Sequence, residues 1–162
     1  MAGMPDESHR LRPDHHPTPF SADQIRDGFV PGRIVRSEVV VAGEAPKFHV
    51  RRHVRAEPDA GVYAFWTEGP DGEQLEVPEE GASNWLELQG HASMPIDATT
   101  VEPVTIDVPM GRYDGLLYTR VDGDTVDRFW FALALPGAPV RMEERVGGDL
   151  VYSSTAIEML DP

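Results

Sequence analysis

The alternation of apolar and polar residues that begins near residue 33 predicts a protein built mainly from β-strands. Val35 and Val39 fall on one face of the first such segment, while Arg36 and Glu38 fall on the other. Successive side chains of a strand point to opposite faces, so this pattern is typical of a half-buried strand. Residues 48–55 follow the same period, and their polar positions are His49, Arg51, His53 and Arg55. This second segment is predicted to be a strand with a cationic outer face.

The segment 62–67, with the sequence VYAFWT, is apolar at nearly every position. A strand that is apolar on both faces is expected to be covered on both sides. Residues 69–72 read Gly-Pro-Asp-Gly, a strong turn signal, so a fourth strand is expected over residues 73–77.

Two short helices interrupt the strands. Ser21, followed three residues later by Gln24, forms a capping-box pattern, and Gly28 closes the helix that it opens. A second helix is predicted over residues 84–93, with Asn84 as its cap and a stripe at helical spacing that comprises Trp85, Leu88 and Ala92.

The C-terminal half reads as a series of antiparallel strands. Asp122-Gly123 predicts the turn of one hairpin, and Gly147-Gly148 predicts the turn of another, in which a clean alternation indicates one solvated face. We therefore expect a mainly β (α+β) fold, with one strongly curved antiparallel sheet or half barrel of about seven to nine strands and two helices packed against it. Residues 1–19 are expected to be a disordered polar arm, and residues 20–162 a single domain.

Composition narrows the classes of function. The chain has 28 acidic residues against 14 lysines and arginines, a net charge of −14, which argues against binding nucleic acid or an anionic membrane surface. It contains no cysteine, which excludes disulfides and thiolate metal sites. No apolar segment has the length of a membrane span or a signal peptide, so a cytoplasmic location is expected.

Three clusters of polar residues are candidates for metal binding or acid–base catalysis. His49 and His53 lie about 13 Å apart on an extended strand, too far to share one metal ion. The aspartates near Gly123 lack the glycine and the glutamate of a calcium loop, so a hairpin turn explains them better. Glu87 and His91 stand at i and i+4 of the second helix, where a carboxylate can orient an imidazole for acid–base catalysis. We assign no catalytic residue, no metal ligand and no cofactor from these patterns.

Aromatic and cationic residues of the predicted sheet are candidates for lining a ligand pocket, although the two tryptophans also suit a core. The candidate ligand-binding residues are Trp66, Trp130, Arg128, Tyr118 and His91.

The layout resembles a known family. A curved sheet with a short N-terminal helix and an inserted helix is similar to the lipoprotein-carrier (LolA-like) half barrel. Residues 129–132, Phe-Trp-Phe-Ala, followed by the Pro-Gly turn at residues 136–137, resemble the step that leads to the closing hairpin in those proteins. The resemblance implies an apolar concave face that carries an acyl chain or another hydrophobic ligand. Residues 17–26 also resemble the opening of an uncharacterised bacterial protein family, which implies no activity.

These observations favour a non-enzymatic binding protein whose concave sheet holds a small hydrophobic or amphipathic molecule or a protein partner. One alternative is a small hydrolase or isomerase that uses His91 and Glu87 as an acid/base pair. Another is a module that docks a partner through the strand carrying Arg51 and Arg55. The sequence leaves the identity of the ligand and the oligomeric state open.

Overall fold

Within residues 3–162, nine antiparallel strands form one curved, unclosed sheet, as the sequence pattern predicts. The computed structural model describes residues 3–162. Its strands, in chain order, are β1 (Ile34–Val41), β2 (Lys47–Ala56), β3 (Ala60–Glu68), β4 (Glu79–Asn84), β5 (Thr99–Val108), β6 (Gly111–Asp122), β7 (Thr125–Ala132), β8 (Arg141–Val146) and β9 (Asp149–Leu160). They follow each other across the sheet in the order β4-β3-β2-β1-β9-β8-β7-β6-β5.

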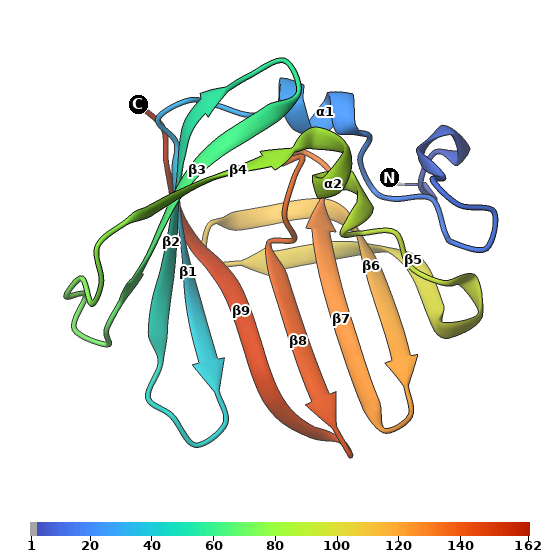
Figure 1. Cartoon of the computed structure of the whole chain (residues 1–162). Coiled ribbons are helices and arrows are strands. Elements are labelled where there is room, and N and C mark those ends of the chain that lie inside the picture. The colour runs from blue at the N-terminus through green and yellow to red at the C-terminus, as the bar shows by residue number, and fades with distance from the viewer. Residues whose placement is uncertain (1–2) are drawn as a thin grey trace.

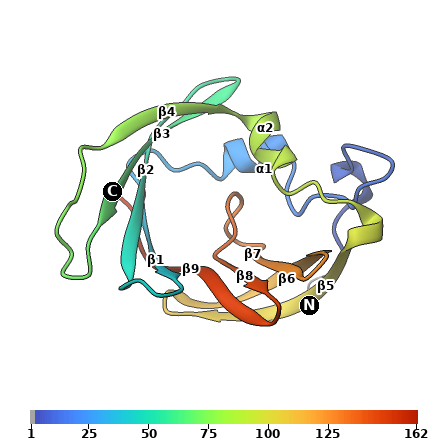
Figure 2. The ribbon, with the colours of Figure 1, turned by 60° about the horizontal axis from the view of Figure 1, so that its bottom comes forward.

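The sheet bends into a half barrel (Figures 1 and 2). Neighbours in the sheet are also neighbours in the chain, except where β1 pairs with β9 and joins the two halves. The pairing of β1 with β9 therefore places the chain's last strand at the centre of the sheet, while β4 and β5 form its edges.

The helices lie over the hollow of this half barrel (Figure 2). The helices over the hollow are α1 (Ala22–Asp27) and α2 (Trp85–Gly90), while the 3-10 turns η1 (Glu7–His9) and η2 (Ile96–Ala98) lie beside it. None of the helices in residues 3–162 has the length and hydropathy needed to span a bilayer.

Local sequence explains where both α-helices begin. The capping box of α1 is confirmed: the Ser21 hydroxyl accepts a hydrogen bond from the amide of Gln24, and the Gln24 side chain accepts one from the amide of Ser21. At α2 the predicted cap is confirmed: the Asn84 side chain accepts a hydrogen bond from the amide of Leu86, at 2.9 Å. The helix is shorter than predicted and ends at Gly90.

The close approach of α2 to the sheet depends on a glycine in β3. A Cβ atom on Gly61 would lie 2.7 Å from the Trp85 ring. The Trp85 indole also donates a hydrogen bond to the carbonyl of Glu57, at 2.9 Å, so this side chain fixes the first turn of α2 against β3.

The β6–β7 hairpin turns one residue later than predicted. Asp122 pairs with Thr125, so the loop is Gly123-Asp124 and not Asp122-Gly123. Gly123 has φ +62, the conformation that glycine adopts most readily at the first position of a two-residue hairpin loop. Compared with the predicted turn, each residue of β6 pairs with a residue two positions later in β7. Because side chains alternate between the faces with a period of two, the pairs still lie on a common face.

The β8–β9 pair departs further from prediction. A register shift between Glu144 and Arg145 places Met142 opposite Ser154, so the alternation expected from the Gly147-Gly148 turn does not continue along the strands. A bulge inserts one unpaired residue and exchanges the faces beyond it.

The strand predicted over residues 73–77 is also wrong, because β4 lies at residues 79–84.

Two hydrophobic clusters support the sheet. The first joins α1 and α2 to β3, β6 and β7, and its buried members include Phe20, Trp85, Met94, Leu116 and Phe131. The second lies where β1 and β9 meet the far ends of β5 and β6, and its buried members are Val35, Ile106, Ala132, Val140 and Ala156.

The N-terminal segment differs from the disordered arm that its composition suggests. Thr18 is fully buried, and its hydroxyl donates a hydrogen bond to the carbonyl of Phe20, at 2.8 Å. The buried His9 ring contacts the carbonyl of Thr18 through Nδ1, at 3.0 Å, and the His16 ring contacts the carbonyl of Thr99 through Nε2, at 2.7 Å. Hydrogen bonds to buried groups therefore hold residues 9–18 against the domain, which polarity alone does not reveal.

Candidate ligand-binding cavity

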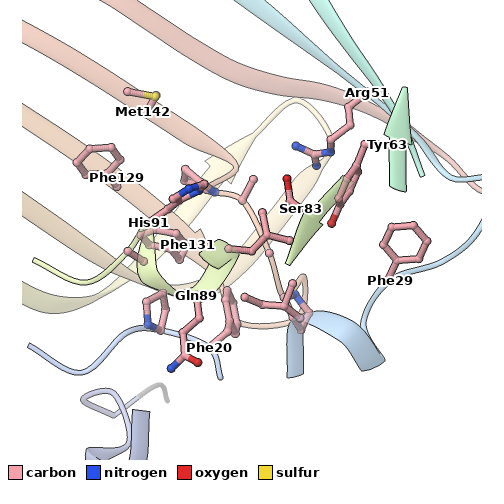
Figure 3. A pocket seen from close by; sticks show the side chains of 18 of the residues that line it. Phe20, Phe29, Arg51, Tyr63, Ser83, Gln89, His91, Phe129, Phe131 and Met142 are labelled. Atoms are coloured by element: carbon pink, nitrogen blue, oxygen red, sulfur yellow. The ribbon is translucent and has the colours of Figure 1, made fainter. Parts of the chain in front are cut away.

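A cavity of about 320 Å³ lies between the inner face of the sheet and the two α-helices. Its walls are mainly apolar: Phe20 and Ile25 come from the α1 region, Leu88 from α2, and Phe129 and Phe131 from β7. Cavities of this size and character are typical of sites for small molecules. Figure 3 shows the aromatic rings and Met142 surrounding the space.

The loop between β7 and β8 forms one wall of the cavity. Residues 136–139, Pro-Gly-Ala-Pro, line it, and the loop projects into the half barrel in Figure 2. At its base, Leu135 donates its amide to the carbonyl of Ala132, and Val140 donates to that of Trp130. Pro136 packs on α1, since a Cβ on Gly28 would lie 3.1 Å from it. The loop is thus fixed at both ends and against a helix.

The polar side chains of β2 face into this cavity and not outward. Arg51 and His53 both line it, whereas the intervening Arg52 is exposed. The predicted cationic outer face is therefore wrong for these two residues, because the sheet curls and the helices cover this side. A register shift between His53 and Arg55 moves Arg55 to the other face, where it pairs with Glu57 at 3.0 Å.

Arg51 is the unusual residue of the cavity. Its Nε atom is shielded from solvent and has no hydrogen-bond partner among the residues described. Burial lowers the pKa of the guanidinium from its ordinary value, with a small opposing effect from Tyr63. In Figure 3 the guanidinium points into the cavity, with the Ser83 hydroxyl nearby.

His53 is buried within an aromatic cluster. Its ring stacks on Phe29 with centroids 4.6 Å apart and meets Tyr63 edge-on at 5.3 Å. Burial, together with the charges of Arg51 and Arg33, lowers its pKa to about 4. The imidazole is therefore neutral at physiological pH.

A second recess of about 370 Å³ adjoins the first. Both are lined by a shared set: Arg51, Phe65, Ala138, Pro139 and Met142. Phe65 is 47% exposed although it is large and apolar, so it stands at the opening and not in the core.

The structure brings two of the five predicted lining residues to these cavities. His91, at the C-terminal end of α2, lines the main cavity. Trp66 lines the second recess, where its indole donates a hydrogen bond to Glu68 at 3.2 Å.

The other three predicted residues lie elsewhere. Arg128 and Trp130 occupy the face of β7 opposite Phe129 and Phe131; Arg128 pairs with Glu143 at 3.2 Å, and Trp130 packs in the second cluster. Tyr118 is fully buried. The alternation of residues along β7 separates Arg128 and Trp130 from Phe129 and Phe131, but it does not tell which face is inward.

The residues that sequence reasoning missed are Arg51, His53 and Tyr63, together with the loop at 136–139. The sequence pattern places Arg51 and His53 on an outer, solvated face, because polar residues usually mark that face of a strand. The aromatic run at residues 62–67 was the available signal that both faces of β3 are covered.

The alternative catalytic pair gains no support from the geometry. Glu87 and His91 are both exposed, and the hydrogen bond between them runs from the His91 amide to the Glu87 carbonyl, at 3.1 Å, and does not involve the carboxylate or the imidazole. Among the described residues, no three histidine, aspartate or glutamate side chains are grouped so that they could hold a metal ion.

The fold and cavity define an open half-barrel protein with a ligand-sized hollow on its inner face. No family model matches the chain, and no curated protein matches it. Among solved structures it is similar to MucB in complex with MucA(peri), with 16% identity and a TM-score of 0.53 over 85% of this chain and 55% of that one. It is also similar to MucB alone, with 13% identity and a TM-score of 0.53 over 86% and 58%.

The chain spans a little over half the length of these structures. At such low identity the likeness concerns the fold alone, and it agrees with the half-barrel layout that the lipoprotein-carrier resemblance implies.

Proposed function

We propose that this protein is a non-enzymatic binding protein that holds a hydrophobic or amphipathic molecule inside its half barrel. The observation that carries the proposal is the apolar cavity of about 320 Å³ between sheet and helices. Burying an alkyl chain there would remove apolar surface from water, at roughly 25 cal/mol per Å². The exposed Phe65 at the opening and the adjoining recess give such a molecule a path to the interior.

The first test is native mass spectrometry of gently purified protein beside its denatured mass. We expect extra mass that is lost on denaturation, because an apolar molecule held among mainly apolar walls dissociates slowly. The mass would identify the class of molecule.

A binding assay with a neutral naphthylamine dye tests the location. Ala138 lines both cavities from an exposed loop position, so Ala138→Trp should fill the space and abolish dye binding. Ala134→Trp is the matched control, because Ala134 is exposed on the same loop but lines neither cavity. A wild-type chain that carries no extra mass and binds no dye would refute the proposal, as would equal binding by both variants.

A protein segment is the second candidate occupant, because one of the similar structures is MucB in complex with MucA(peri). In that case native mass spectrometry would find a bound polypeptide, and the Ala138→Trp variant would lose it.

A further inference from the structure

The charges around the main cavity differ from those of the protein as a whole. The chain has 28 acidic residues against 14 lysines and arginines, yet none of the described residues that line the cavity is an aspartate or a glutamate. The ionisable residues that line the cavity are Arg51, two histidines and Tyr63. A main cavity without a carboxylate in its lining, inside so acidic a protein, suits an anion and disfavours a cation, whereas the adjoining recess has one carboxylate, that of Glu76, among its described lining residues.

Arg51 is also set apart from the other arginines. Eleven of the remaining twelve form ion pairs with carboxylates, at distances of 2.6–3.6 Å. The twelfth, Arg52, is exposed, with its guanidinium 6.0 Å from the Trp66 ring centroid. Arg51 alone, among the described arginines, points into an apolar cavity with its Nε buried and unbonded.

A guanidinium whose Nε is buried and unbonded is costly for the folded protein. Removal of a charge from water is unfavourable unless an opposite charge and hydrogen bonds replace the lost hydration. A bound carboxylate would supply both, because the guanidinium fork matches its two oxygens. His53 does not compete as a partner, since burial lowers its pKa and keeps it uncharged.

We propose that the occupant is an anionic single-chain amphiphile, whose carboxylate pairs with Arg51 while its alkyl chain lies among Phe20, Phe129, Phe131 and Met142. This inference rests on the proposed binding function and names its ligand class. The boundary between the two recesses, where Arg51 and Phe65 belong to both, holds the head group, and the apolar lining of the main cavity holds the chain.

The test compares two ligands that share a chain length and differ in charge, dodecanoate and dodecanol, by displacement of the neutral dye. The variants are Arg51→Gln and Arg51→Met, with Arg52→Gln as the matched control from the neighbouring, exposed position. We expect both Arg51 variants to bind dodecanoate at least about tenfold more weakly and dodecanol as well as the wild type does. The control should bind both ligands normally.

Each outcome decides between the two proposals. Unchanged dodecanoate binding by both Arg51 variants, or an equal loss of both ligands, would overturn the role of Arg51 and leave the binding function standing. Failure of the wild type to bind either ligand would overturn the binding function itself. Urea unfolding of each variant shows whether a loss of binding comes from misfolding. If Arg51→Gln does not fold, the comparison of the two ligands is made with Arg51→Met.

Discussion

Acid should destabilise this protein through His53. The side chain is only 8% exposed, and burial together with the charges of Arg51 and Arg33 lowers its pKa from 6.5 to about 4. Protonation is therefore easier in the unfolded chain than in the native one. For a histidine whose pKa is lowered on folding, the stabilisation is fully present above the unfolded value and is lost as the pH falls through the folded value.

The size of the effect follows from these two pKa values. Each pH unit between them changes the free energy of unfolding by up to about 1.4 kcal/mol. Near pH 6.5 the unfolded histidine is only half protonated, so lowering the pH from 7 to 5 removes about 2 kcal/mol in total. That is a large part of the stability of an ordinary domain.

His53→Phe isolates this contribution. Phenylalanine keeps an aromatic ring against Phe29 and Tyr63 but cannot be protonated, while every other titrating group stays in place. Urea unfolding at pH 7, 6 and 5 should give the wild type a free-energy loss about 2 kcal/mol greater than that of the variant. Two parallel pH profiles would refute the reasoning, because they would mean that His53 is protonated as easily in the folded protein as in the unfolded one.

Three further substitutions test the fold. Tyr118→Phe removes the 2.7 Å hydrogen bond to the carbonyl of Pro17 and should cost about 1–3 kcal/mol in urea unfolding, with faster amide exchange over residues 9–18; unchanged exchange would contradict this. Gly115→Ala would bring a Cβ within 2.3 Å of the carbonyl oxygen of Phe131, so thermal unfolding should show a loss of about 2 kcal/mol or more. Gly90→Ala meets open space at the end of α2 and should instead stabilise the protein by about 0.4–1 kcal/mol; a lower melting temperature would argue against that helix end.

Local rules predicted the parts of the fold that depend on near neighbours. The capping box at Ser21 and Gln24 needs residues only three apart, and the β6–β7 hairpin keeps its faces because its turn moved the pairing by two. The shift at Glu144 could not be predicted in this way, since a bulge exchanges faces without any mark in the alternation.

The cavity could not be predicted from the sequence, because it is formed by segments that lie far apart along the chain. Alternation along β2 separated Arg51 and His53 from their apolar neighbours, but only the curl of the sheet and the position of the helices decide which side is enclosed. The loop at residues 136–139 was visible as a Pro-Gly turn, whereas its packing against α1 involves residues more than 100 positions away. His91 lines the cavity because α2 ends beside it, a position that its i, i+4 spacing from Glu87 does not reveal.

The unclosed sheet leaves two strands, β4 and β5, each with a single neighbour. Free backbone groups along such strands invite pairing with another chain, which is a route to aggregation. Both strands carry features that oppose it. On β4, Glu79 and Glu80 are exposed acidic neighbours, and on β5, Pro103 lacks the amide hydrogen that a further strand would need. These features oppose edge-to-edge pairing of the open sheet, and replacement of Pro103 by a β-branched residue is expected to promote self-association.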